Sequence, residues 1–296
     1  MGTPEFAVAS LRVLVENGQN VVAVITAPDK PKGRGKKLGT SPVKDYAESK
    51  NLKILQPTNL KNPDFINELA SYKADLQIVV AFRMLPEVVW NMPPKGTFNL
   101  HASLLPKYRG AAPINWAIIN GEKETGITTF FLQHEIDTGK IIFQEKENIK
   151  ADDNVGTLYN RLMEKGANLV LKTVNAIEQD NYTEYDQEES EDLPSAPKIH
   201  RETCEINWLQ PGDRIINFVR GLSPYPAAWT KWDGKNLKVY EVEKLLHSSG
   251  SDIGVIRIEE NKMVVNAEDG TLALTEVQLE GKKRMKTSDL LRGYKF

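Results

Sequence analysis

Cysteine is almost absent from this sequence, since Cys204 is the only one among 296 residues. A lone thiol can form neither an internal disulfide framework nor a cysteine-based metal site, so disulfide-stabilised secreted scaffolds and zinc-cysteine domains are excluded. We therefore expect a cytoplasmic protein that binds no metal and whose one thiol is inert.

Long apolar runs are absent as well. Runs such as Val21–Ile25 and Leu76–Phe82 have the length of a strand, whereas a helix that spans a bilayer needs about 20 apolar residues. Met1–Pro4 has neither the basic start nor the apolar core of a signal peptide. We expect no membrane partner.

An excess of charge is also missing, because 38 basic and 40 acidic residues give a formal net charge of −2. Locally the charges do not balance: residues 30–37 hold five basic residues in eight and no acid. Such a run is usually a solvated surface loop. Two features favour contact with RNA: the run follows the carboxyl end of a predicted strand, and its glycines let Arg34 approach a phosphate backbone closely.

Strands and helices alternate through the first half of the chain. This alternation predicts an α/β fold with a Rossmann-like, doubly wound and mostly parallel sheet. Ser41 is expected to cap a helix over 42–50. A long amphipathic helix over 153–179 would cover one face of the sheet. The predicted strands of this half are 21–26, 53–55, 76–81, 97–100, 127–132 and 140–145.

The pattern changes after residue 180. Residues 181–197 are acidic and rich in proline, which indicates a linker that runs over the surface. We divide the chain into a first domain over 1–180, a linker over 181–203 and a C-terminal domain over 204–296. Five short strands and one helix predict a small C-terminal OB-like β-barrel: strands 227–232, 237–242, 254–258, 263–265 and 272–279, and helix 213–220.

The segment 96–114 contains the strongest candidates for a catalytic site. Asn99 and His101 alternate with apolar residues at the end of a predicted strand, so their side chains project to the same face. Ligands of open parallel sheets bind beyond the carboxyl ends of the strands. Asp137 lies in a turn between two further predicted strands. An amide donor, a base that titrates near neutrality and a carboxylate that orients it together suit acyl transfer.

Each of these residues also has a plainer interpretation. A histidine at a strand end is often a hydrogen-bonded structural group, and Asp137-Thr-Gly139 is ordinary turn chemistry. Phe82, Met84 and Leu85 could line a pocket or belong to the core.

Four motifs decide between these interpretations. Asn99-x-His101, Ser103-Leu-Leu-Pro106, Arg109-Gly-Ala-Ala-Pro-Ile114 and Asp137-Thr-Gly139, in this order and spacing, resemble the folate-dependent formyltransferase family. The similarity is continuous from Met1 to about Gly221 and weaker beyond. Ala102 stands where the family often has proline, a departure that removes no chemical group.

The resemblance implies an enzyme that transfers a formyl group from 10-formyltetrahydrofolate to the α-amino group of methionyl initiator tRNA, for translation initiation. Asn99 would donate to the oxyanion, His101 would move protons, and Asp137 would orient His101. The resemblance also implies a folate pocket at Ser103, Leu104, Leu105 and Pro106, with a pterin site near residues 84–86.

The same resemblance implies a tRNA partner. Arg34, together with Lys36 and Lys37, would enter the acceptor stem, and the C-terminal barrel would bind the same tRNA. A second basic cluster, Lys282 to Lys286, is consistent with that partner. We expect the chain to act as a monomer.

Two other functions remain open. A relative that formylates a small amine, such as glycinamide ribonucleotide or an amino-sugar nucleotide, would need neither the basic loop nor the barrel. An RNA-binding protein without catalysis would bind tRNA with no dependence on folate, and would not need Asn99, His101 and Asp137.

The start of the chain gives one more expectation. In the family a short apolar strand precedes the turn that corresponds to Met1–Pro4 and lies at the centre of the sheet. Without it, neighbouring strands would keep unpaired backbone groups, each costing roughly 1–3 kcal/mol if buried. We therefore expect the recorded start to be late, with Met1 an internal methionine.

Overall fold

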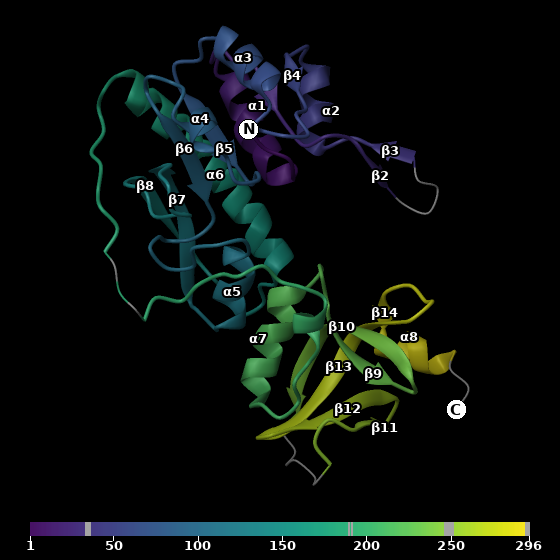
Figure 1. Cartoon of the computed structure of the whole chain (residues 1–296). Helices are drawn as coiled ribbons and strands as arrows, with labels where there is room; N and C mark the ends of the chain where they lie inside the picture. Colours follow the sequence, from purple (N-terminus) through teal and green to yellow (C-terminus); the bar gives the residue numbers. More distant parts are fainter. Residues whose placement is uncertain (33–36, 189, 191, 246–251, 294–296) are drawn as a thin grey trace. The chain divides into compact units, whose positions relative to one another are not determined.

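The computed structural model describes residues 1–32, 37–188, 190, 192–245 and 252–293 (Figure 1). The chain forms two compact units, each assembled from three stretches. Unit 1 comprises Met1–Arg109, Gly126–Glu147 and Asn160–Pro194, and unit 2 comprises Gly110–Thr125, Asn148–Tyr159 and Ser195–Phe296. No helix in the described ranges is long and apolar enough to cross a membrane.

Unit 1 is a Rossmann-like α/β fold. Its strands and helices alternate along the chain, with β7 and α6 beginning in unit 2 and β8 ending there. The elements are α1 Glu5–Glu16, β1 Val24–Ile25, β2 Lys30–Lys32, β3 Lys37–Gly39, α2 Pro42–Ser49, β4 Ile54–Leu55, α3 Pro63–Ser71, β5 Gln77–Val80, α4 Glu87–Trp90, β6 Thr97–His101, β7 Glu124–Phe131, β8 Ile141–Asn148 and α6 Val155–Glu178.

The strands of unit 1, predicted to be mostly parallel, pair in both directions. β1 pairs in parallel with β4, and β5 pairs in parallel with β6. β6 is antiparallel to β7 in the four-stranded order β5-β6-β7-β8. Met1 and Gly2 connect the two sheets: Val80 N donates to Met1 O over 2.9 Å, and Gly2 N donates to Ile25 O over 3.0 Å.

Local sequence signals explain the two helices that flank the sheet. The Ser41 hydroxyl accepts a hydrogen bond from Lys44 N at the start of α2, as the N-cap position predicts. Along α6 a stripe of apolar side chains is buried at helical spacing. A Cβ on Gly166 would lie 2.8 Å from a methyl group of Leu100, so α6 packs closely against β6.

Glu147 at the end of β8 joins the sheet to two basic residues of α6. Its side chain is 16% exposed and accepts from Arg161 Nε at 3.0 Å and pairs with Lys165 Nζ at 2.7 Å. Burial alone would raise the pKa of this carboxyl, but the hydrogen bonds from the two cations outweigh it and hold the pKa below its ordinary value.

The basic segment after β1 was expected to be a loop, which is wrong for residues 30–32 and 37–39. β2 and β3 form an antiparallel hairpin, with Lys30 opposite Gly39 and Lys32 opposite Lys37. The sequence does not predict these strands, because proline, glycine and lysine alternate in this segment. Strands are predicted from β-branched and aromatic residues. At the base of the hairpin, Asp29 pairs with Lys44 at 2.5 Å and accepts from Gln56 at 2.8 Å.

Unit 2 contains an antiparallel sheet and its own core. All five predicted strands are present, and β14 and α8 were missed. The elements are α5 Pro113–Ile119, the 3-10 helix Glu202–Cys204, α7 Gly212–Leu222, β9 Ala228–Trp232, β10 Lys235–Leu245, β11 Ile256–Glu259, β12 Lys262–Ala267, β13 Gly270–Leu279, β14 Met285–Lys286 and α8 Thr287–Arg292.

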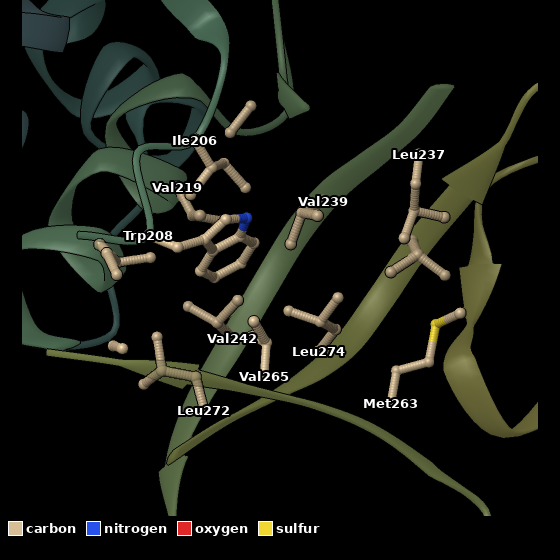
Figure 2. Close-up of a cluster of buried hydrophobic side chains, with 14 of the residues drawn as sticks. Ile206, Trp208, Val219, Leu237, Val239, Val242, Met263, Val265, Leu272 and Leu274 are labelled. Carbon is tan, nitrogen blue, oxygen red and sulfur yellow. The ribbon is translucent and has the colours of Figure 1, made fainter. Parts of the chain in front are cut away.

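The core of unit 2 lies between α7 and the sheet. Figure 2 shows Trp208 among apolar side chains of β10, β12 and β13, including Val239, Val265 and Leu272. The indole nitrogen of Trp208 donates to the Thr230 hydroxyl over 3.1 Å. The strand order is β11-β12-β13-β10-β9, with β14 on β13. In the described ranges β9 and β11 end this path without pairing to each other, so no closed barrel is detected.

Candidate active site

His101 and Asp137 face each other at the carboxyl end of β6 in unit 1. His101 is the last residue of β6 and is 6% exposed. Its Nδ1 lies 3.8 Å from Oδ2 of Asp137, whose side chain is 13% exposed. Asp137 lies in the loop between β7 and β8 at a φ of 56°. Two residues that lie on either side of β7 in the sequence therefore form a pair whose side chains are largely buried.

The second nitrogen of His101 defines its tautomer. Nε2 lies 2.9 Å from the carbonyl oxygen of Tyr108. Because a carbonyl oxygen only accepts, Nε2 carries a hydrogen in both the neutral and the charged ring. Nδ1 is the nitrogen that faces Asp137. An imidazole beside a carboxylate is an arrangement suited to proton transfer.

Asn99 lies on β6 two positions before His101, so both residues are on one face of the strand. Its neighbours in the sheet are Val79 and Phe130, and its side chain is half-buried. Within the described ranges, the structure gives its amide no hydrogen bond to another side chain or to the backbone. The amide can therefore donate to a ligand.

Hydrogen bonds to neighbouring residues of the protein hold the Ser103–Pro106 turn. The Ser103 hydroxyl donates to the Lys107 carbonyl over 2.7 Å. The buried Thr128 hydroxyl donates to Ser103 O at 2.7 Å and accepts from Leu105 N at 3.2 Å. The Leu105 side chain belongs to the core with Phe130. The parts of the turn that remain available to a ligand are the half-buried side chains of Leu104 and Pro106.

The neighbouring candidates for a pterin site divide between core and surface. Leu85 is 7% exposed and packs in the core of unit 1, so for this residue the core interpretation holds. Met84 is 68% exposed.

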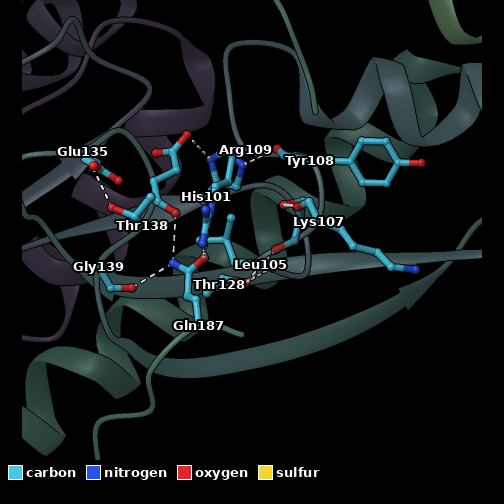
Figure 3. A network of polar contacts seen from close by, with 12 residues as sticks. His101, Leu105, Lys107, Tyr108, Arg109, Thr128, Glu135, Thr138, Gly139 and Gln187 are labelled. Carbon is cyan, nitrogen blue, oxygen red and sulfur yellow. Dashed lines mark hydrogen bonds and ion pairs between the residues drawn. The ribbon is translucent and has the colours of Figure 1, made fainter. Parts of the chain in front are cut away.

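Gln187 is a residue of this network that the sequence did not indicate. Figure 3 shows its side chain between Arg109 and the loop that carries Asp137 and Gly139. It belongs to the acidic segment that was expected to run over the surface. Its own side chain is partly buried, although residues 183–186 and Glu188 beside it are exposed. A single glutamine in an acidic run gives no local signal of such a contact.

The predicted tRNA contacts lie mostly beyond what the structure describes. Arg34 and Lys36 are outside the described residues, and Lys37 is described only as part of β3. In the second basic cluster, Arg284 pairs with Glu276 at 2.5 Å and lies 4.2 Å above the Tyr240 ring. Its charge is therefore partly compensated. The described residues contain no group of three or more His, Cys, Asp or Glu able to hold a metal ion.

Comparison with known proteins places this sequence in a family. The sequence profile described as "Formyl transferase" matches residues 1–174, and that described as "Formyl transferase, C-terminal domain" matches residues 198–295. The methionyl-tRNA formyltransferase of Bacteroides thetaiotaomicron is 55% identical over 305 residues, which cover 100% of this chain and 95% of the relative. That of Parabacteroides distasonis is 56% identical over 306 residues, with 100% and 94% covered.

Solved structures agree at the level of the fold. The N-formyltransferase from Helicobacter canadensis, in complex with folinic acid and dTDP-3-aminofucose, has a TM-score of 0.66 at 22% identity, with 92% of this chain and 96% of that chain covered. HypX from Aquifex aeolicus, in complex with tetrahydrofolic acid, has a TM-score of 0.60 at 21% identity, with 82% and 43% covered. From both profiles and from identity over its whole length, this chain belongs to the formyl transferase family.

Proposed function

We propose that this chain transfers a formyl group from 10-formyltetrahydrofolate to the α-amino group of methionyl initiator tRNA. The observation that carries the proposal is the approach of His101 Nδ1 to Asp137 Oδ2, at 3.8 Å, with Asn99 on the same face of the same strand as His101. The identity of more than half to methionyl-tRNA formyltransferases over the full chain supports this choice of substrate.

The reaction needs no nucleophile from the protein. The methionyl nitrogen attacks the formyl carbon, forming a C–N bond and a tetrahedral intermediate whose oxygen is negatively charged. The Asn99 amide donates to that oxygen, a role typically worth about 3 kcal/mol. His101 takes the proton of the attacking amine at Nδ1 and returns it to N10 of the folate as the C–N10 bond breaks. Asp137 stabilises the charged imidazole between these steps.

The folate would bind against the Ser103–Pro106 turn. Ser103 and Leu105 hold the turn by their internal contacts, while Leu104 and Pro106 face the ligand. This division of roles follows from the buried Ser103 and Leu105 side chains.

The tRNA would be bound by the basic hairpin and by the C-terminal part of the chain. Neutralising Arg34, Lys36 and Lys37 to glutamine should weaken tRNA binding and flatten its dependence on salt, because fewer phosphates are neutralised. Folate binding should persist. Lys61→Gln, at an exposed position of the same unit, is the control. A salt slope unchanged from that of the control would assign the hairpin no tRNA contact.

We assign residues 1–180 to the catalytic domain, 181–203 to the linker and 204–296 to a tRNA-binding domain, in which the antiparallel sheet would be part of an OB-like barrel. The chain would act as a monomer in the cytoplasm. Limited proteolysis, with mass spectrometry of the fragments, tests the boundaries. Light scattering of the purified chain tests its mass.

The deciding experiment is direct. The protein is incubated with 10-formyltetrahydrofolate and methionyl initiator tRNA, and formyl-methionine is measured after deacylation. Glycinamide ribonucleotide and an amino-sugar nucleotide replace the tRNA in parallel reactions. Formylation of a small amine and not of the tRNA would contradict the proposal, and tRNA binding without formyl transfer would favour an RNA-binding protein.

A further inference from the structure

We propose that Gln187 is a positioning residue, which fastens the loop of Asp137 so that its carboxylate stays opposite His101. The inference rests on the proposed formyl transfer for its kinetic consequence. Its structural part, the fastening of the loop, stands on the contacts of Gln187 alone.

The Gln187 amide uses every hydrogen-bonding position it has. Its Oε1 accepts from Arg109 Nε at 3.0 Å and from Arg109 Nη2 at 2.7 Å. Its Nε2 donates to the carbonyl of Asp137 at 2.9 Å and to that of Gly139 at 2.8 Å. An amide offers two donor hydrogens and an oxygen with two lone pairs, and here all are used (Figure 3). The reverse orientation of the amide would place oxygen against two carbonyls, so the contacts allow only one.

The segment that carries Gln187 is held on both sides of it. Two residues before, Tyr185 exchanges two backbone hydrogen bonds with Ile141, of 2.8 and 2.9 Å. Seven residues after, Pro194 O accepts from Tyr108 N over 2.6 Å. The backbone on both sides of Gln187 is therefore already fixed. Little conformational entropy is lost when its side chain contacts the loop.

Gln187 contacts a loop whose backbone is left-handed at Asp137, with a φ of 56°. Residues other than glycine adopt this conformation uncommonly, although aspartate tolerates it better than most. The bonds of Thr138, to Glu135 O at 3.1 Å and from Gln133 at 2.8 Å, are internal to the loop. On the outer side, His134 meets Glu87 at 3.5 Å, but both side chains are more than half exposed, so this pair adds little.

Gln187 also joins the loop to the residue next to Tyr108. Arg109 follows the carbonyl that receives the Nε2–H of His101. The Gln187 amide thus holds the backbone on both sides of the His101 ring, through Arg109 on one side and through the Asp137 carbonyl on the other. A displacement of about 1 Å at a reacting group can cost up to a hundredfold in rate, so loosening this amide should be visible in turnover.

The test compares three variants. Gln187→Leu removes all four hydrogen bonds. Gln187→Glu keeps the acceptor for Arg109 but replaces the donor to the two carbonyls by an oxygen. Gln179→Leu makes the first change at an exposed glutamine of the same unit and is the control. Hydrogen exchange of peptides covering 133–139 is measured together with kcat and KM for formyl transfer to methionyl initiator tRNA.

We expect exchange in 133–139 to accelerate about tenfold in both Gln187 variants and kcat to fall about tenfold to a hundredfold, with KM for both substrates within about twofold of the unsubstituted chain. Gln179→Leu should change neither quantity. Exchange in Gln187→Leu equal to that of the control would overturn the inference. So would a Gln187→Glu variant that behaves like the unsubstituted chain, because the Arg109 contact alone would then suffice.

These readouts separate the two proposals. If the unsubstituted chain does not formylate methionyl initiator tRNA, the proposed function fails, and the exchange data still decide whether Gln187 fastens the loop. If Gln187→Leu does not fold, Gln187→Glu, which has nearly the same size and keeps one contact, supplies the same comparison.

Discussion

Replacing Thr128 by valine should loosen the Ser103–Pro106 turn at a single buried atom. The Thr128 side chain is fully buried. Its hydroxyl donates to Ser103 O at 2.7 Å and accepts from Leu105 N at 3.2 Å and from Gln144 Nε2 at 3.0 Å. Gln144 keeps a second bond, to Leu105 O at 2.8 Å. Valine, of nearly equal volume, therefore leaves two buried backbone groups without this partner.

Each such group costs about 1–3 kcal/mol, so Thr128→Val should lower the free energy of unfolding by about 2–6 kcal/mol. That is a large share of a typical total of about 5–15 kcal/mol. Because the turn is the proposed folate contact, KM for the folate donor should rise as well. Urea denaturation and steady-state kinetics measure the two effects.

Thr129→Val is the matched control for this prediction. Its hydroxyl lies on the other face of β7 and meets the Thr173 hydroxyl at 2.9 Å. Thr173 also donates to Leu169 O at 2.7 Å, so it keeps a partner. We expect a loss of only about 1 kcal/mol and an unchanged KM for the folate donor. Equal losses in the two variants, with equal KM values, would refute the reasoning.

Four further substitutions give three more predictions. Asn99→Ala and His101→Ala should each lower kcat by about a hundredfold or more while tRNA affinity, measured by filter binding, stays unchanged; turnover near normal would remove the residue from the reaction. Gly139→Ala should destabilise by about 1–3 kcal/mol in thermal melts, because its Cβ would lie 1.6 Å from the Phe131 carbonyl oxygen; a melting temperature equal to that of Gly270→Ala, where the Cβ meets nothing closer than 3.8 Å, would contradict this. Glu147→Gln should cost about 2 kcal/mol at pH 7. Since the folded pKa of Glu147 is depressed, this cost should vanish as pH falls below the unfolded value near 4.5 and through the folded one; a cost that does not decrease as the pH is lowered from 7 would be inconsistent.

Local patterns in the sequence determined most of the elements of this protein. The Ser41-Pro42 cap, the apolar stripe of 153–179 and the alternation at Asn99 and His101 each concern residues a few positions apart, and all three are found where they were predicted. Backbone geometry imposes these periods, so they can be read without knowing the fold. The family motifs added the candidate site, whose catalytic roles remain predictions.

Only the tertiary structure decided how that site is supported. Gln187 contacts the Asp137 carbonyl 50 positions away, and His101 is oriented by the backbone carbonyl of Tyr108. Every residue has such a carbonyl, so the residue type at 108 says nothing about this bond. The pairing of β2 with β3 and the antiparallel pairing of β6 with β7 were not predicted for a related reason, since pairing depends on which strands meet and not on the composition of one strand.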